Sequence, residues 1–248
     1  MPHEKGTRSK VCAIVGAGDY IGAAIARRFA REGYVIVAGR RGGEKLKPLG
    51  DEITASGGTL VARSLDARSE EAVDEFIQAA AELGELSVVI FNIGGNVKFP
   101  IADTTERVFR KVWQMACYGG FLTGRAAARV MLRQGSGSIF FTGATASMRG
   151  GSGYGAFASA KFGLRGLAQA MARELGPENI HVAHLVIDSA VDTEWVRQLI
   201  TERAGAAALA ATPLLDPASV ADTYWILHNQ PKDCWTHELD VRPSNETF

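Results

Sequence analysis

A tyrosine and a lysine, Tyr154 and Lys161, stand seven residues apart in a segment rich in glycine and alanine. Residues at this spacing return to the same face of a helix, so a phenol and an ammonium group could share one pocket. Such a pair suits proton transfer to a substrate oxygen or stabilisation of a developing enolate. Between them lies Phe157, whose phenyl ring cannot exchange a proton. The alternative is that Tyr154 is an ordinary residue at a pocket rim or an interface.

A second group of residues has the chemistry of phosphate binding. The apolar run Val11–Val15 leads into a glycine-rich turn, and an alanine-rich helical pattern follows. Such a turn between a strand and a helix lets backbone N–H groups approach a pyrophosphate. The last glycine comes one residue later than in G-x-G-x-x-G, but the strand and the helix supply the context that the motif requires. The sequence therefore predicts a dinucleotide site whose loop contains Gly16, Gly18, Asp19, Tyr20, Ile21 and Gly22.

The next strand indicates which dinucleotide would bind. It ends at Gly39 and is followed by Arg40 and Arg41, about where an NAD site has an acidic residue on the ribose 2′-hydroxyl. Gly39 has no carboxylate that would repel a phosphate, and guanidinium groups bind phosphate in bidentate fashion. We therefore expect NADP(H) to be preferred over NAD(H). The alternative is a pair of solvated loop arginines.

A parallel sheet is needed to position these residues. Short β-branched runs alternate with longer helical patterns, which is typical of βαβ units. The predicted strands are Lys10–Val15, Tyr34–Ala38, Thr59–Leu65, Leu86–Phe91, Gly137–Thr142, Ile180–Ile187 and Glu238–Val241. The predicted helices are Ile21–Glu32, Glu44–Ser56, Glu70–Leu83, Thr105–Gln134 and Gly155–Leu175, with another that begins at Pro217 after an Asp216 N-cap.

The domain organisation follows from the absence of a Pro-, Gly- or Ser-rich linker between these elements. A chain of 248 residues, 46% of them hydrophobic, can bury a large core. The sequence therefore predicts a single α/β domain over residues 1–248. Its expected architecture is a Rossmann-like, doubly wound sheet of seven parallel strands with helices on both faces.

Composition excludes several classes of protein. The 27 acidic residues balance the 27 basic ones, which argues against nucleic acid or an anionic membrane as a partner. The first ten residues lack the apolar core of a signal peptide, and no apolar run of 18 residues follows. Three widely spaced cysteines suit a reducing compartment better than a disulfide framework. We expect a cytoplasmic protein that acts on a small molecule.

With these motifs the chain resembles the short-chain dehydrogenase/reductase family over nearly its whole length. Its glycine loop is similar to that family's T-G-x-x-x-G-x-G, with Val15 for the threonine and Tyr20 for the middle glycine. The resemblance implies an adenine contact, a loop after the fourth strand and a nicotinamide contact near residues 191–193. It also implies that residues 193–212 form a variable substrate loop with an apolar lining. The further cofactor residues that it implies are Asp66, Ala67, Asn92, Ile93, Gly94, Lys161, Val191 and Thr193.

The catalytic positions depart from the family pattern. Where the family has an asparagine, a serine and a tyrosine, this chain has Ala116, Ala144 and Phe157, so that only Lys161 is retained. A general acid contributes about 10²–10⁴-fold, so carbonyl reduction by the usual route should be crippled. In the family the lysine also binds the nicotinamide ribose, and its retention here fits cofactor binding alone.

Three functions are therefore considered. The first is an NADP(H)-dependent oxidoreductase with a rebuilt site, in which Tyr154 and Lys161 act on an activated C=C or C=O bond of a small apolar substrate. The Tyr-x₆-Lys spacing resembles the enoyl-thioester reductase branch of the superfamily. The second is a catalytically silent dinucleotide-binding homologue, and the third is a structural subunit of a hetero-oligomer. We favour the first by a small margin.

The remaining polar residues give no further site. His181 and His184 are three apart on a strand and hence on opposite faces, so no metal pair is expected. Asp188 is interpreted as a loop cap rather than a catalytic base. By the resemblance, copies of the chain should pair through the helices at 105–134 and 155–175, as a homodimer or homotetramer.

Overall fold

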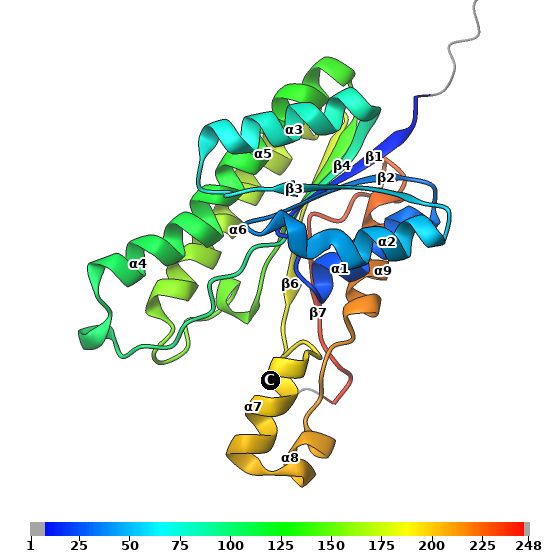
Figure 1. The fold of residues 1–248 in the computed structure, drawn as a ribbon. Helices are drawn as coiled ribbons and strands as arrows, with labels where there is room; N and C mark the ends of the chain where they lie inside the picture. Colours follow the sequence, from blue (N-terminus) through cyan, green and yellow to red (C-terminus); the bar gives the residue numbers. More distant parts are fainter. Residues whose placement is uncertain (1–7, 246–248) are drawn as a thin grey trace, which may run out of the picture.

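Seven parallel strands form one sheet in the order β3-β2-β1-β4-β5-β6-β7. The structure is a computed structural model that describes residues 8–245; the outer ends of the predicted domain and the residues before 8 lie outside this range. Figure 1 shows the sheet with helices on both faces, which confirms the predicted Rossmann-like fold. The strands are β1 (Lys10–Val15), β2 (Val35–Arg40), β3 (Thr59–Ser64), β4 (Glu85–Phe91), β5 (Gly137–Thr142), β6 (Ile180–Ile187) and β7 (Glu238–Val241).

The central strands β1, β4, β5 and β6 are buried on both faces, because their successive residues alternate between two apolar cores. In β1, for example, Val11 and Ala13 pack on one side and Cys12 and Ile14 on the other. The first core is covered by α3 (Glu70–Leu83), α5 (Gly119–Gln134) and α6 (Gly155–Leu175). The second is covered by α1 (Ile21–Arg31), α2 (Lys47–Ala55) and α9 (Pro217–His228). Continuous apolar strands of this kind are typical of parallel sheets.

The order of the strands reverses between β1 and β4. Val15 at the end of β1 pairs with Gly39 of β2 on one side and with Phe91 of β4 on the other. At this switch point the chain leaves the two neighbouring strands in opposite directions, which opens a crevice at their carboxyl ends. The glycine loop after β1 and the segment after β4 therefore lie at the same crevice.

Two predicted helices are interrupted. The region predicted as helix Thr105–Gln134 consists of α4 (Glu106–Trp113), a π-helical turn at Gln114–Tyr118 and α5. The region predicted as helix Glu44–Ser56 is a 3₁₀ turn at Gly43–Leu46 followed by α2. Pro48 lies in the first turn of α2, where its missing N–H leaves no hydrogen bond unmade. The helix therefore begins afresh there.

The predicted substrate loop, residues 193–212, is a small helical lobe of α7 (Glu194–Ala204) and α8 (Ala206–Ala211). In Figure 1 it projects from the end of the sheet. No residue from 193 to 214 is buried. Its base is a neck in which Val191 bridges to Leu215, and Asp192 N–H donates to the Leu215 carbonyl at 2.8 Å. Over the described part of the chain, no helix has both the length and the apolar character to cross a membrane.

Candidate active site

Two glycines give the loop after β1 its shape. Gly16 has φ +94°, and a Cβ there would lie 2.6 Å from the carbonyl oxygen of Asn92. A Cβ on Gly22 would lie 2.6 Å from the Cα of Ala17. Real Cβ atoms are not found that close, so α1 can meet the loop, and the loop can meet β4, only through glycine.

The backbone donors of this loop divide into two groups. The N–H groups of Gly16 and Ala17 donate to the carbonyl of Gly39 at 2.9 and 3.0 Å, which ties the loop to the end of β2. By contrast, no side chain caps the N-terminus of α1. The first N–H groups of a helix have no partner within the helix, and they favour an anion. Gly18 is open, with no atom within 4 Å of where its Cβ would be. A pyrophosphate would therefore fit against the backbone from Gly18 to Gly22.

Asn92 joins three strands at the crevice. Its side-chain nitrogen donates to the carbonyl of Gly16 at 3.1 Å, and its side-chain oxygen accepts from the Thr142 hydroxyl at 3.0 Å. Thr142, at the end of β5, also shares a hydrogen bond of 2.7 Å with the Tyr224 hydroxyl. Asn92 therefore fixes the glycine loop relative to β4 and β5. Gly94, two residues on, has open space around it.

Lys161 lies in the second turn of α6 and is almost completely buried. Its ammonium group donates to the backbone carbonyls of Ile93 and Thr142 at 3.0 and 2.7 Å. Burial lowers the pKa of Lys161 to about 7, because the charged form loses its hydration. The Nζ atom also lies 5.9 Å from the centroid of the Phe157 ring. The retained lysine therefore contacts the same β4 and β5 ends that Asn92 connects.

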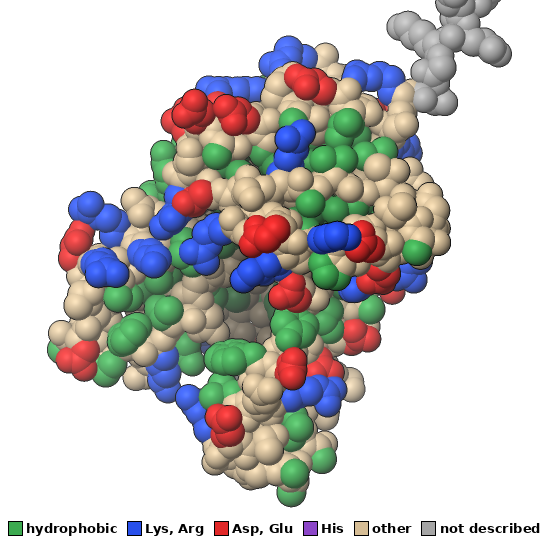
Figure 2. Space-filling model, viewed as in Figure 1, with side chains coloured by type: hydrophobic (Ala, Val, Ile, Leu, Met, Phe, Trp, Pro, Cys, Tyr) green, Lys and Arg blue, Asp and Glu red, His purple; other side chains and the backbone are tan. Residues whose placement is uncertain are grey.

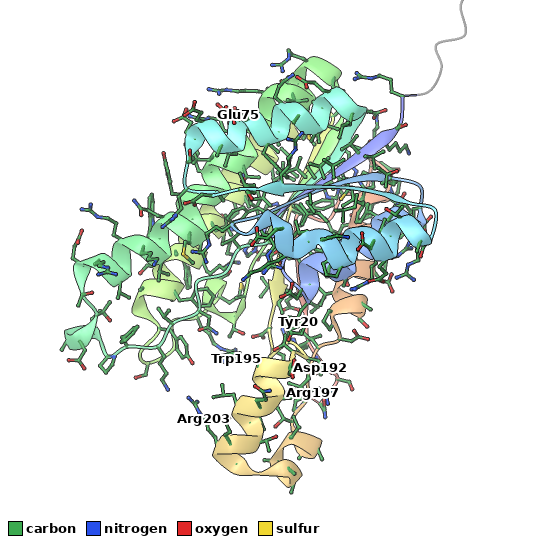
Figure 3. The ribbon with its side chains drawn as sticks, in the orientation of Figure 1. Tyr20, Glu75, Asp192, Trp195, Arg197 and Arg203 are labelled. Carbon is green, nitrogen blue, oxygen red and sulfur yellow. The ribbon has the colours of Figure 1, made fainter. Side chains whose placement is uncertain are left out.

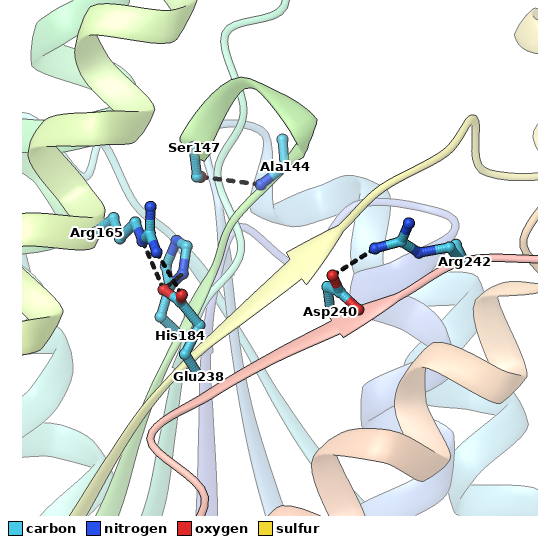
Figure 4. Close-up of polar contacts among 7 residues, drawn as sticks. All are labelled: Ala144, Ser147, Arg165, His184, Glu238, Asp240 and Arg242. Atoms are coloured by element: carbon cyan, nitrogen blue, oxygen red, sulfur yellow. Dashed lines mark hydrogen bonds and ion pairs between the residues drawn. The ribbon is translucent and has the colours of Figure 1, made fainter. Parts of the chain in front are cut away.

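The three replaced catalytic positions lie together in a separate apolar cluster. Ala116 is in the π-helical turn, Phe157 is in the first turn of α6, and the half-buried Ala144 follows β5. Ala116 and Phe157 belong to one core of small and apolar side chains, which also contains Val112 and Cys117. Ala144 packs against this core. Burial raises the pKa of Cys117, so its thiol is a weak nucleophile at neutral pH. The buried hydroxyl of Ser147 lies beside this cluster, where it accepts a hydrogen bond from Ala144 N–H at 3.1 Å (Figure 4).

Tyr154 immediately precedes α6 and is partly buried against this apolar cluster. The ammonium group of Lys98 lies 5.7 Å from the centroid of its ring. Between residues 8 and 245 its hydroxyl has no hydrogen-bond partner. The Tyr154 side chain packs against the cluster that contains Phe157, and its role in catalysis stays a prediction.

The predicted adenosine end is occupied by ion pairs. Arg40 holds the carboxylate of Asp19 at 2.5 Å. Asp66 accepts from the guanidinium of Arg68, and this contact, with Arg41 nearby, holds the pKa of Asp66 below its usual range. Both carboxylates thus have cationic partners in the structure. The sequence named Asp19 only as a loop residue and did not anticipate that it would pair with Arg40.

The predicted nicotinamide end is built on the neck of the lobe. Val191 forms the bridge to Leu215, and the hydroxyl of Thr193 accepts from Val196 N–H at 3.1 Å, which caps α7. The hydroxyl of Tyr20 accepts from Glu194 N–H, also at 3.1 Å. The contact predicted for Thr193 with the cofactor carboxamide stays a prediction, since its hydroxyl already serves as a helix cap.

Two charged networks escaped sequence reasoning, and Figure 4 shows the first of them. In the first, buried His184 contacts Glu238 at 3.2 Å, and Glu238 accepts two hydrogen bonds from Arg165 of α6. Burial lowers the pKa of His184 to about 4, so the imidazole is neutral at pH 7. Glu238 is 54 residues from His184 and 73 residues from Arg165 along the chain, and no local motif relates these residues.

The second network corrects the interpretation of Asp188 as a loop cap. Its carboxylate is buried and lies 3.6 Å from Arg149 and 3.5 Å from Arg242. A buried carboxylate requires such partners, because an unpaired charge is costly away from water. Asp188 therefore links the loop after β5 to the segment after β7.

Comparisons with known proteins agree with this geometry. A family model described as short chain dehydrogenase matches residues 10–204. Human 3-oxoacyl-[acyl-carrier-protein] reductase is 30% identical over 194 residues, which cover 78% of this chain and 80% of the human protein. A solved short-chain dehydrogenase from Rhodopseudomonas palustris is 56% identical, with a TM-score of 0.82, and the match covers 94% of this chain and 98% of that one.

Two further solved relatives were captured with a nicotinamide cofactor. The alcohol dehydrogenase of the archaeon Thermococcus sibiricus, complexed with 5-hydroxy-NADP, is 25% identical with a TM-score of 0.82 over 96% of this chain and 99% of that one. A 7α-hydroxysteroid dehydrogenase complexed with NADH is 25% identical with a TM-score of 0.80 over 94% and 93%. Relatives therefore bind either NADP-type or NAD-type cofactors. By the family model, the sequence identity and the strand order together, the chain belongs to the short-chain dehydrogenase/reductase family.

Proposed function

We propose that the protein is an NADP(H)-dependent oxidoreductase with a non-standard site, which reduces an activated C=C or C=O bond of a small apolar substrate. The proposal rests on the difference between two sets of residues at one crevice, those that would bind the cofactor and those that would handle the substrate proton. The groups that would hold a dinucleotide are present and connected through Asn92 and Lys161. The positions that would handle the substrate proton are apolar. A site of this kind favours a reaction that needs little acid catalysis.

An activated double bond meets that requirement better than an isolated ketone. The nicotinamide, when bound, would supply the hydride. The developing charge would then rest on an oxygen conjugated to the reacting carbon, where one hydrogen-bond donor is of most use. Tyr154 is our candidate for that donor, since its hydroxyl has no partner among the described residues. Lys161 would orient the cofactor ribose and favour negative charge nearby.

The preference for NADP(H) rests on the end of β2. Gly39 cannot carry an acid, and a Cβ there would lie 2.7 Å from Leu65, so the position also excludes larger residues sterically. Arg40 and Arg41 follow, and the Arg40 guanidinium is already engaged by a carboxylate. A group that binds a carboxylate in this way is equally suited to a phosphate.

The alternative is a dinucleotide-binding homologue without catalysis. The apolar packing of Ala116 and Phe157 favours it, because the side chains that pack with them in this core are small or apolar. The two functions make the same prediction for cofactor binding. They differ only in turnover, which makes turnover the measurement that separates them.

The test is a fluorescence titration with NADPH and NADH, followed in the same sample by a panel of ketones, enones and enoyl thioesters. We expect tight NADPH binding and oxidation of NADPH with an enone or enoyl thioester. Tyr154→Phe should retain the binding and lose most of the turnover, whereas the control Tyr118→Phe should retain both. Tight binding without turnover on any compound would establish the silent homologue, and no binding of either cofactor would refute both functions.

We further propose that two copies associate through the helices at one side of the molecule. Large apolar side chains of α4, α5 and α6 are exposed there, and exposed apolar patches mark interaction surfaces. A cytoplasmic location accords with three free cysteines. The mass in solution, measured by light scattering, should be that of a dimer or tetramer and should fall when these side chains become polar. The exposed side chains are Phe109, Trp113, Phe121 and Phe162.

A further inference from the structure

The glycine loop and the helical lobe are joined by the side chain of Tyr20. Its hydroxyl accepts a hydrogen bond of 3.1 Å from the backbone N–H of Glu194, a residue 174 positions away in the chain. Figure 3 shows Tyr20 at the junction between the body of the molecule and the start of α7. In the family's glycine motif, which this loop resembles, the position of Tyr20 is a glycine. A large side chain thus stands where the loop would otherwise be bare.

The lobe has few other restraints. None of its residues between 193 and 214 is buried, and α7 packs chiefly against α8. The neck supplies the bridge between Val191 and Leu215 and a few backbone hydrogen bonds. Segments with little buried apolar surface open locally at low free energy. The orientation of α7 therefore depends on a small number of contacts, of which Tyr20 is one.

The hydrogen bond from Glu194 falls at the first turn of α7. The first four N–H groups of a helix need partners from outside the helix. Val196 N–H finds one in Thr193, and Glu194 N–H finds one in Tyr20. Glu194 lies in the exposed part of the chain, so water would replace the Tyr20 hydroxyl at little cost to the helix itself. What the tyrosine adds is attachment to the glycine loop.

The attachment sets the position of the residue that follows Glu194. Trp195 is 63% exposed and in Figure 3 extends from the first turn of α7 on the side away from Asp192 and Arg197. Figure 2 shows a hollow between the lobe and the rest of the molecule. Moving the start of α7 would thus change the mouth of the crevice.

We propose that Tyr20 is a positioning residue that latches lid helix α7 to the cofactor loop and couples the two. The backbone of Tyr20 belongs to the stretch from Gly18 to Gly22 against which a pyrophosphate would lie, so a ligand there acts on the same residue that holds the lid. The coupling, unlike the latch, rests on the proposed function. With the latch closed, release of a bound dinucleotide is slow.

The latch itself is tested without cofactor by hydrogen exchange of the full chain. Tyr20→Phe removes only the hydroxyl and should raise the exchange rate of the Glu194 amide and of residues 194–204 about fivefold, the factor that one hydrogen bond of ordinary net strength supplies. The control Tyr118→Phe, which removes a hydroxyl from the other side of the molecule, should leave this segment unchanged. Unchanged exchange of residues 194–204 in Tyr20→Phe would overturn the latch.

The coupling is tested with NADPH as the probe. Its dissociation rate, measured by stopped-flow fluorescence, should rise about fivefold in Tyr20→Phe, and NADPH should protect residues 194–204 in the wild type more than in the variant. Tyr20→Gly, which removes the whole side chain, should reproduce both changes. An equal dissociation rate in all three proteins would overturn the coupling. If the wild type fails to bind NADPH at all, the proposed function fails, and the exchange experiment on the free protein still decides the latch.

Discussion

The two sides of the crevice are built on opposite principles. On the cofactor side, polar groups are connected in a chain: Asn92 bonds to the glycine loop and to Thr142, and Lys161 bonds to the carbonyls beside both. On the catalytic side, Ala116 and Phe157 are buried among small apolar residues. Lys161 lies between the two sides, with its ammonium group on the polar framework and 5.9 Å from the centroid of the Phe157 ring.

From this difference we predict that cofactor binding and turnover depend on separate groups of residues in this chain. Loss of a general acid removes a rate factor without affecting the groups that hold a dinucleotide. Among residues 8–245, the hydrogen bonds of the buried Lys161 amine go to two backbone carbonyls, those of Ile93 and Thr142. Variants on each side should therefore have separable effects on binding and on turnover.

The largest effect is expected at the glycine loop. Gly22→Val places a branched side chain where even a Cβ would lie 2.6 Å from Ala17, so the start of α1 must move away from the loop. Loss of two charge-assisted hydrogen bonds would weaken NADPH by at least about 100-fold. Calorimetric titration measures this, with circular dichroism to verify the fold. Gly50→Val in α2 is the control, because the nearest atom to its Cβ is 3.6 Å away. Wild-type affinity in Gly22→Val would remove the loop from the binding site.

The next effect separates the two cofactors. Arg40→Asp puts an acid where the 2′-phosphate of NADP would lie, and a hydrogen bond to a charged group is worth about 1.5–3 kcal/mol. NADPH should bind roughly 10- to 100-fold more weakly, while the affinity for NADH changes less than about threefold. Parallel fluorescence titrations give the ratio, with Arg133→Asp on α5 as a control for net charge. Equal losses for both cofactors would mean that Arg40 does not recognise the phosphate.

Lys161, at the border of the two sides, should make the free energy of unfolding depend on pH. Its pKa is about 7 in the folded protein and near 10.5 when exposed. Between these values the unfolded chain holds a proton that the folded chain has released, so this group makes the free energy of unfolding rise with pH, by at most about 1.4 kcal/mol per unit. Below pH 7 the contribution is constant.

The measurement is urea unfolding of the wild type and Lys161→Met at several pH values from 6 to 10. The difference in unfolding free energy, wild type minus variant, should increase through this window. Lys232→Met, at an exposed lysine, should give a flat difference. A flat difference for Lys161→Met as well would show that the amine keeps its proton in the folded protein.

Sequence reasoning located the elements that repeat a local pattern. Six elements have the predicted bounds: β1, β5, β6, β7, α3 and α6. Their apolar patterns involve residues close together in the sequence, so they can be recognised without knowledge of the fold. The resemblance to the family, rather than periodicity, implied that Ala116, Ala144 and Phe157 share one site, and Ala144 packs against the cluster that contains the other two. Sequence reasoning missed the π-helical turn at Gln114–Tyr118 and the restart of α2, which depend on packing and on one proline.

The contacts that it missed at the site are long-range. Arg165 and Glu238 are 73 residues apart, and Tyr20 and Glu194 are 174 apart. No periodicity or motif relates such residues, since their proximity is a product of the completed sheet. Asp188 was interpreted as a loop cap for the same reason: its partners, Arg149 and Arg242, come from two distant loops.

The smallest expected effect concerns Asp19, whose carboxylate holds Arg40 at 2.5 Å. If Arg40 receives the 2′-phosphate, the two anions compete for one guanidinium. Asp19→Asn keeps the size of the side chain and removes its charge. The pair is well exposed on the Asp19 side, so its worth is that of a surface ion pair, about 0.2–1 kcal/mol, and NADPH should bind up to about fivefold more tightly. The gain should disappear in 1 M salt, where exposed charges are screened, and NADH should gain less because it lacks the 2′-phosphate. Weaker NADPH binding in Asp19→Asn would instead mean that the carboxylate orients Arg40 for the phosphate. The Asp19–Arg40 ion pair would then be part of the polar framework that holds the cofactor.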